Sequence, residues 1–162
     1  MKYKKYIHSM LLSVMAICAC VMTSSCDELD EGPYDNPFVY IEADGGASRI
    51  VVNSDVQNVN SYNVYLSSRA LTKNLEVYYE IIVGDGLQAG RDFELVTQGS
   101  GLTFFPGIYD MPIRIRWKPC QVNPSKNNTL TIRLTGTNMG FTVGMPGPDR
   151  LKSELVIEKK NP

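Results

Sequence analysis

Histidine and cysteine are scarce in this 162-residue chain, and their positions exclude several kinds of chemistry. The only histidine, His8, and two of the four cysteines, Cys18 and Cys20, lie within the first 25 residues. If that segment is removed, no imidazole remains, which excludes Ser-His and Cys-His nucleophiles and histidine-ligated zinc. If the thiol of Cys26 is also modified, Cys120 has no partner for a disulfide, and we expect it to be a small, half-buried residue at a strand end.

A basic excess is also missing from most of the chain. Three of the 16 lysines and arginines and five of the 17 aspartates and glutamates lie in residues 1–35, so residues 36–162 carry a formal net charge of +1. Binding to a phosphate backbone depends on a concentration of positive charge. We therefore expect no nucleic acid partner.

The first 25 residues have the three-part organisation of a secretion signal. A basic stretch at residues 2–5 precedes an uncharged, mostly apolar run at residues 6–22, and small residues at 23–25 lead to Cys26. This arrangement resembles the signal peptide of bacterial lipoproteins, which implies cleavage before Cys26 and attachment of a diacylglycerol to its thiol. Two alternatives stay open: a retained transmembrane helix, for which the run falls short of about 20 apolar residues, and a plain signal peptide with soluble release.

Residues 26–36 form an acidic segment without apolar periodicity. The acidic residues are Asp27, Glu28, Asp30, Glu31 and Asp35. Such a composition cannot bury enough surface to fold, so we expect a flexible tether between the lipidated cysteine and the folded domain. Acidic residues directly after a lipidated cysteine resemble the surface-export signal of Bacteroidetes lipoproteins, although a solvated spacer has the same composition. The resemblance implies a lipid-anchored protein of the cell envelope, on the outer membrane and exposed at the cell surface.

Short alternating segments recur along residues 37–160 and predict β-strands. The predicted strands are 38–42, 49–53, 61–67, 74–84, 102–105, 111–117, 129–135, 141–143 and 155–157. The first two flank a turn that contains Gly45 and Gly46, which predicts a hairpin, and a long loop follows residue 84. No segment has the 3.6-residue period of an amphipathic helix. The chain is therefore predicted to form one all-β domain, an antiparallel β-sandwich of about seven to eight strands.

Two motifs in this domain resemble those of Calx-β domains. They are Gly90-Arg91-Asp92-Phe93 and Leu102-Thr103-Phe104-Phe105-Pro106-Gly107, and the similarity extends over residues 75–158. The resemblance implies an immunoglobulin-like sandwich used for adhesion, matrix or glycan contacts, or as a spacer. Calcium-binding members carry clustered acids after the strand that matches residues 111–117, whereas residues 118–126 contain none. We expect neither metal nor cofactor, and Asp92 is predicted to be a turn residue bonded to nearby amides.

Four outward-facing side chains are candidate ligand contacts. Tyr65 and Tyr78 fall opposite the apolar side chains of their strands, and aromatic faces bind the C–H surfaces of sugars. Arg114 and Arg116 alternate with apolar residues and could supply polar contacts, as could Asn63. Isolated outward tyrosines are also ordinary strand residues, so a purely structural role stays open.

Strand position argues against a sugar-binding tryptophan and against a catalytic pair of glutamates. Trp117 shares its parity with Ile113 and Ile115, which predicts a core residue rather than a sugar platform. Glu76 and Glu80 lie on one strand face about 13 Å apart by strand rise. Paired catalytic carboxylates of glycosidases are ~5–9.5 Å apart. We therefore predict no catalytic residues and no enzyme activity.

These observations lead to one expected function and one rival. We expect a lipid-anchored β-sandwich that serves as a non-catalytic binding or accessory module at the cell surface, with the link to glycans or adhesion resting on the resemblance alone. The rival is a structural spacer or assembly subunit that pairs an exposed strand edge with another surface protein. The expected partners are the membrane, through the lipid on Cys26, and either a glycan or a surface protein.

Overall fold

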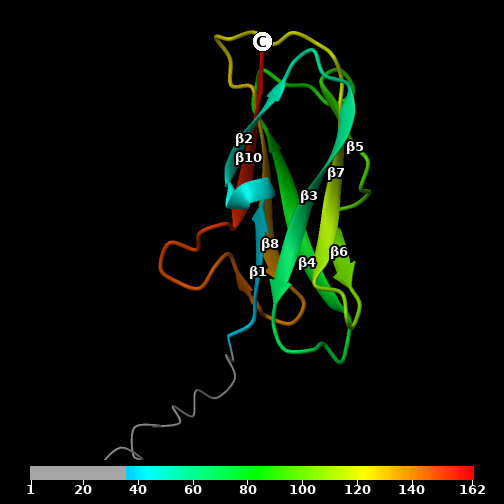
Figure 1. The fold of residues 1–162 in the computed structure, drawn as a ribbon, viewed down its shortest axis with the longest axis vertical. Coiled ribbons are helices and arrows are strands. Elements are labelled where there is room, and N and C mark those ends of the chain that lie inside the picture. The colour runs from blue at the N-terminus through cyan, green and yellow to red at the C-terminus, as the bar shows by residue number, and fades with distance from the viewer. Residues whose placement is uncertain (1–35) are drawn as a thin grey trace, which may run out of the picture. The chain divides into compact units, whose positions relative to one another are not determined.

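The structure is a computed structural model, and it describes residues 36–162 (Figure 1). The predicted signal peptide, the predicted lipidation site Cys26 and the predicted tether up to residue 35 lie outside the described residues. The described part of the chain contains ten strands and one short 3-10 helix. These elements are β1 (Phe38–Glu42), η1 (Asp44–Gly46), β2 (Arg49–Asn53), β3 (Asn58–Ser67), β4 (Leu75–Val83), β5 (Phe93–Leu95), β6 (Gly101–Phe104), β7 (Asp110–Trp117), β8 (Thr129–Thr137), β9 (Thr142–Val143) and β10 (Glu154–Lys160).

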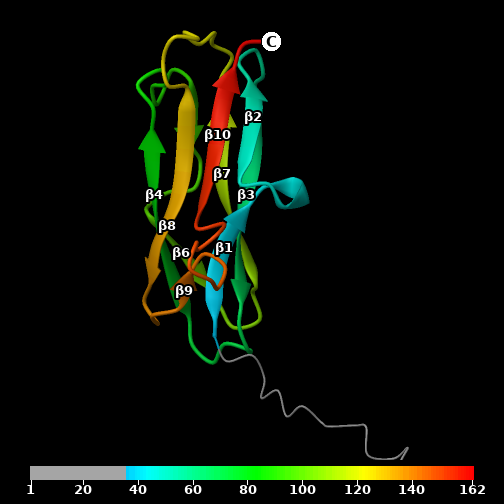
Figure 2. The same cartoon turned by 90° about the vertical axis from the view of Figure 1, so that its left-hand side faces the viewer.

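The strands form two five-stranded sheets that pack face to face (Figures 1 and 2). Sheet A has the order β5-β7-β3-β1-β9, and sheet B has the order β2-β10-β8-β4-β6. The prediction of an all-β, immunoglobulin-like sandwich is confirmed, with ten strands in place of about seven to eight. The predicted long loop contains β5, which pairs with β7. Two pairs, β1–β9 and β2–β10, are parallel rather than antiparallel.

The predicted hairpin between the first two strands is wrong. β1 pairs with β3 in sheet A, and β2 pairs in parallel with β10 in sheet B. The turn uses the positive φ angles of Gly45 (76°) and Gly46 (81°) to carry the chain across to the other sheet. Two glycines in a turn are compatible with a hairpin within one sheet and with a crossing between sheets. The crossing is favoured because Ile41 and Val52 then face one core from opposite sheets, with 0% and 7% of their surfaces exposed.

The core lies between the two sheets and is built from the inward-facing residues of both. Ile113, Ile115 and Trp117 of β7 are fully buried, so the prediction that Trp117 is a core residue is confirmed. The indole Nε1 of Trp117 donates a hydrogen bond to the hydroxyl of Tyr62 at 3.0 Å, which satisfies its only polar atom. Residues 36–162 supply two paired sheets and a hydrophobic core between them, which is the organisation of a domain that folds by itself.

Candidate functional site

Three aromatic side chains gather on the outer face of sheet A, and we call Phe38, Tyr40 and Tyr65 the aromatic ladder. The alternation of β1 buries Val39 and Ile41 and so directs Phe38 and Tyr40 outward. Tyr40 lies directly opposite Tyr65 of β3, and their rings stack with centroids 5.2 Å apart and an interplanar angle of 25°. The ring of Phe38 continues the row 5.7 Å from Tyr40. Cross-strand aromatic pairs also stabilise a sheet, so the ladder has a structural role in addition to any binding role.

A charged pair borders the ladder. The ammonium of Lys152 forms an ion pair with Glu42 and lies 5.9 Å from the centroid of the Tyr40 ring. Burial, followed by the nearby Glu42 carboxylate, raises the pKa of the Tyr40 hydroxyl above its ordinary value, against the opposing effect of Lys152. The hydroxyl of Tyr40 is therefore protonated at neutral pH and can donate a hydrogen bond.

A shallow groove of about 620 Å³ opens beside the ladder, where β1 ends and the chain crosses to β2. Its lining combines the ring of Tyr65 with two carboxylates, two side-chain amides and two hydroxyls. The polar lining residues are Glu42, Asp44, Asn60, Ser61, Tyr62 and Asn63. An aromatic wall with convergent polar groups is the usual composition of a small-ligand site.

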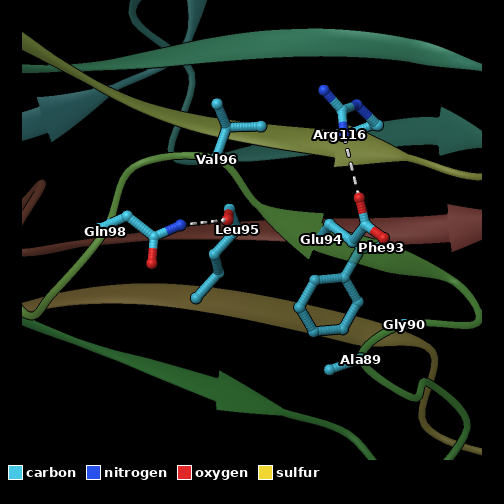
Figure 3. Close-up of a pocket in the computed structure, with 8 residues that line it drawn as sticks. All are labelled: Ala89, Gly90, Phe93, Glu94, Leu95, Val96, Gln98 and Arg116. Carbon is cyan, nitrogen blue, oxygen red and sulfur yellow. Dashed lines mark hydrogen bonds and ion pairs between the residues drawn. The ribbon is translucent and has the colours of Figure 1, made fainter.

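Arg114 and Arg116 lie on the same outer face of sheet A as Tyr65. In the register of β3 with β7, Ser61 is opposite Arg114 and Val59 is opposite Arg116. The guanidinium of Arg116 is held by Glu94 at 3.0 Å, as Figure 3 shows. No hydrogen bond or ion pair within residues 36–162 engages the side chain of Arg114, which is exposed. The structure therefore places three of the four predicted contacts on one face, with the aromatic ladder at one end and the two arginines at the other.

Tyr78, the fourth predicted contact, is not part of this face. It lies on β4 in sheet B, where Val77 and Tyr79 on either side are buried. Its side chain is 44% exposed, which confirms the predicted outward direction. Because sheet B forms the opposite outer face of the sandwich, Tyr78 cannot contact a ligand that lies on Tyr65.

A second hollow, of about 560 Å³, lies along β5 (Figure 3). Phe93 forms part of its wall, but only 2% of that side chain is exposed. Its charged groups are already paired, because Glu94 binds both Arg116 and Lys118, and these two cations lower the pKa of Glu94. The hollow therefore offers fewer unpaired polar groups than the groove beside Tyr65.

Sequence reasoning missed Phe38 and Tyr40. The signal was present, since both residues alternate with the apolar Val39 and Ile41 in the predicted strand 38–42. Their outward direction followed from the same parity that selected Tyr65. Their closeness to Tyr65 did not follow, because it depends on β1 pairing with β3 instead of with β2.

A buried ion pair was also missed. Asp92 accepts a hydrogen bond from the backbone N–H of Gln88 at 2.9 Å, which confirms its prediction as a turn residue bonded to nearby amides. Its other oxygen lies 3.1 Å from the ammonium of Lys159, and both side chains are fully buried. Arg91 contacts the same carboxylate at 2.6 Å. Lys159 is 67 residues away in β10. Nothing in the sequence around this lysine predicted that its side chain would be buried.

The structure also places the acidic candidates and Cys120. Within residues 36–162, no group of three or more His, Cys, Asp or Glu side chains is arranged to hold a metal ion. Glu76 accepts a hydrogen bond from Thr103, and Glu80 is ion-paired with Arg133. Cys120 is a free, half-buried cysteine, as predicted. Among the described residues, no helix has the length and apolar character needed to cross a membrane.

Comparison with known proteins establishes the fold. No family model matches the chain, and no curated protein matches it. The chain is similar to the crystal structure of CBD12 from CALX1.2, with a TM-score of 0.52 and 20% sequence identity over 75% of this chain. The similar region spans 44% of the length of that structure. The resemblance to a Calx-β-like β-sandwich is therefore confirmed at the level of the fold.

Proposed function

We propose that this Calx-β-like β-sandwich is a non-catalytic binding module of the cell envelope, anchored in the outer membrane by a lipid on Cys26. Its ligand is a glycan that lies on the outer face of sheet A. The observation that carries this proposal is the aromatic ladder, because Tyr65 borders a groove of about 620 Å³ lined with polar side chains. Aromatic rings with nearby hydrogen-bonding groups suit sugars, which have apolar C–H faces and polar edges.

The polar groups on this face favour particular sugars, with the carboxylates of Glu42 and Asp44 in the groove and the guanidinium of Arg114 farther along β3. Asn60 and Asn63 can both donate and accept hydrogen bonds, so they suit sugar hydroxyls. Arg114 is exposed and opposite Ser61, and its guanidinium suits the carboxylate of an acidic sugar. A net gain of about 0.5–1.5 kcal/mol per hydrogen bond gives modest affinity for a single sugar unit. We therefore expect a glycan of several units, with an acidic sugar at the Arg114 end.

Replacement of Tyr65 tests the ladder. Tyr65→Ala should weaken glycan binding about tenfold or more, equivalent to ~1.4 kcal/mol, because it removes the ring that borders the groove. Tyr78→Ala is the matched control, since it removes an exposed tyrosine from the opposite sheet and should leave binding within about twofold and stability within ~1 kcal/mol. A glycan array with residues 36–162, followed by calorimetric titration of the best ligand, measures both variants.

Two outcomes would contradict the proposal. One is a wild-type domain that retains no glycan on the array. The other is a glycan whose binding is weakened by Tyr78→Ala and left unchanged by Tyr65→Ala. The urea unfolding midpoint of each variant separates loss of binding from loss of fold, because Tyr65→Ala also removes the stacking with Tyr40.

The anchor has a test of its own. Cys26→Ala should move the protein out of the membrane fraction, because it removes the thiol that receives the lipid. At ~0.8 kcal/mol per buried CH₂, two or more acyl chains hold a protein on a membrane almost irreversibly. Cell fractionation with a labelled fatty acid measures this shift. A variant that stays in the membrane fraction, together with a wild-type protein that takes up no label, would refute lipidation at Cys26.

A further inference from the structure

β1 covers only half of β3, and the other half has an open edge. Residues Phe38–Glu42 pair with Asn63–Ser67, after which η1 leads the chain to sheet B. The first half of β3, from Asn58 to Tyr62, therefore has β7 on one side and no strand of the described residues on the other. In Figure 1, β1 ends well below the upper end of β3.

The backbone groups that point to this edge can be identified from the ladder. The N–H of Leu66 donates to the carbonyl of Tyr109 on the β7 side at 2.8 Å. Successive residues of a strand direct their N–H and C=O groups to opposite sides, so Ser61 and Val59 direct theirs away from β7. The backbone N–H of Arg114, which lies opposite Ser61, donates a hydrogen bond to the hydroxyl of Thr97 on the β5 side. It therefore points away from β3, as expected if Ser61 points away from β7. No residue of 36–162 hydrogen-bonds the N–H and C=O groups of Ser61 and Val59.

The open edge faces the groove described above. The opposite wall is β2, with Ile50 half-buried and Val51 56% exposed. Val59 on the β3 side is itself 48% exposed. The groove therefore combines unpaired backbone groups on the β3 wall with apolar surface on the β2 wall, which is the composition that accepts an added strand.

The other end of sheet A shows how this protein closes an edge. At β5, the carbonyl of Phe93 accepts a hydrogen bond from the backbone N–H of Gly90 at 2.8 Å. The side-chain amide of Gln98 caps the carbonyl of Leu95 at 3.5 Å (Figure 3). The first half of β3 has no such capping groups among the described residues.

We propose that the edge of β3 at Val59 and Ser61 accepts an extended peptide segment of a partner protein, which takes the place that β1 leaves empty. The partner segment alternates apolar and acidic side chains. Its apolar residues point toward Ile50 and Tyr62 in the groove, and its acidic residues lie on the outer face. This site shares the groove and Arg114 with the proposed glycan contact, so the two ligands would compete, but it depends on backbone groups instead of the ring of Tyr65.

The acidic character of the partner follows from Arg114. A residue opposite Ser61 on an added strand lies two strand spacings from Arg114, about 10 Å between Cα atoms, which an arginine and a glutamate side chain bridge together. Arg114 has no ion-pair partner within residues 36–162. A second copy of this chain, paired through the same edge, would bring another Arg114 and Arg116 close to the first pair. Charge therefore favours an acidic partner segment over self-association.

Synthetic peptides test the proposal with residues 36–162. The probe is the heptapeptide Val-Glu-Val-Glu-Val-Glu-Val, and its controls are the Val-Lys version and a version methylated at its backbone nitrogens. Wild type should bind the probe with a Kd tighter than about 1 mM. The methylated and the Val-Lys peptides should bind at least about tenfold more weakly, because one loses the donors and the other loses the charge match.

Two proline variants locate the pairing strand. Ser61→Pro removes an N–H that has no partner, so it should preserve the fold and weaken probe binding about tenfold or more. Asn53→Pro removes an outward N–H of β2 away from the groove lining, because Ser48 and Ser54 on either side of β2 bond β10 and the odd-numbered residues between them point the other way. It is the matched control and should leave binding within about twofold. If Ser61→Pro fails to fold, the methylated peptide still tests the same backbone hydrogen bonds, because it is measured with the wild-type protein.

Four outcomes would overturn the proposal. If the wild-type domain shows no binding at probe concentrations up to about 1 mM, the site is excluded. Equal binding by Ser61→Pro and Asn53→Pro removes the pairing from β3. Equal binding of the methylated peptide shows that backbone pairing is not involved. Concentration-dependent dimers in sedimentation, abolished by Ser61→Pro, assign the edge to a second copy of the chain.

Discussion

Asp92→Asn is expected to lower the free energy of unfolding by ~3–5 kcal/mol, because it leaves a buried lysine without its counter-charge. Asp92 and Lys159 are both fully buried with 3.1 Å between carboxylate and ammonium. The ammonium also donates to the carbonyl of Lys118 at 2.9 Å, but a neutral acceptor cannot offset a desolvated charge. Urea unfolding of residues 36–162 measures the loss.

A double variant gives the control. Asp92→Asn combined with Lys159→Met removes both charges and should recover a large part of the lost stability, because a buried pair replaced by uncharged side chains is often tolerated. The pair joins the turn before β5 in sheet A to β10 in sheet B, so we attribute to it a role in fixing how the two sheets meet. An Asp92→Asn protein within about 1 kcal/mol of wild type would contradict the assignment of a strong buried pair.

The same pair predicts a dependence on pH. Burial acts to raise the pKa of Asp92, but the N–H of Gln88, the guanidinium of Arg91 and the ammonium of Lys159 outweigh it, and the pKa lies below its ordinary value. A lowered folded-state pKa stabilises the protein above the unfolded-state pKa of ~3.9. This contribution is lost as the pH falls through the folded-state pKa. The difference in stability between wild type and Asp92→Asn should therefore shrink below about pH 4.

Trp117→Ala is expected to cost ~3–5 kcal/mol of stability through lost burial and the cavity that remains. The side chain is fully buried and its ring lies 6.1 Å from that of Phe93, between centroids. The change also removes the hydrogen bond to the hydroxyl of Tyr62, which keeps a weaker contact with Asn60 at 3.3 Å. The loss should appear as a lower urea midpoint.

A smaller change at the same site provides the comparison. Trp117→Phe keeps most of the ring volume and loses the indole N–H, so it should cost less than Trp117→Ala. If Trp117→Ala loses binding to a ligand, the loss should be explained by unfolding of the variant, which the urea measurement detects. A Trp117→Ala protein that is as stable as wild type and has lost a glycan ligand would refute the core assignment and make Trp117 a contact residue.

Strand parity could be predicted from sequence because it is a local property with a period of two residues. It placed Trp117 inside, and it placed Tyr78 and Arg114 outside, all in agreement with the structure. It failed at Val83, which shares parity with the buried Leu75 and yet is 40% exposed. Parity assigns a residue to one face of a strand but does not tell how far the core extends along that face.

The sequence by itself determined the all-β class, the position of most strands, the two faces of each strand and the resemblance to Calx-β domains. Only the tertiary structure decided that β1 and β2 separate into different sheets, that Tyr40 stacks on Tyr65, that Asp92 meets Lys159 and that half of β3 has an open edge. The physical reason is the range of the interactions. Alternation is imposed by the geometry of the strand, whereas the choice of partner depends on which long-range pairing buries the most apolar surface.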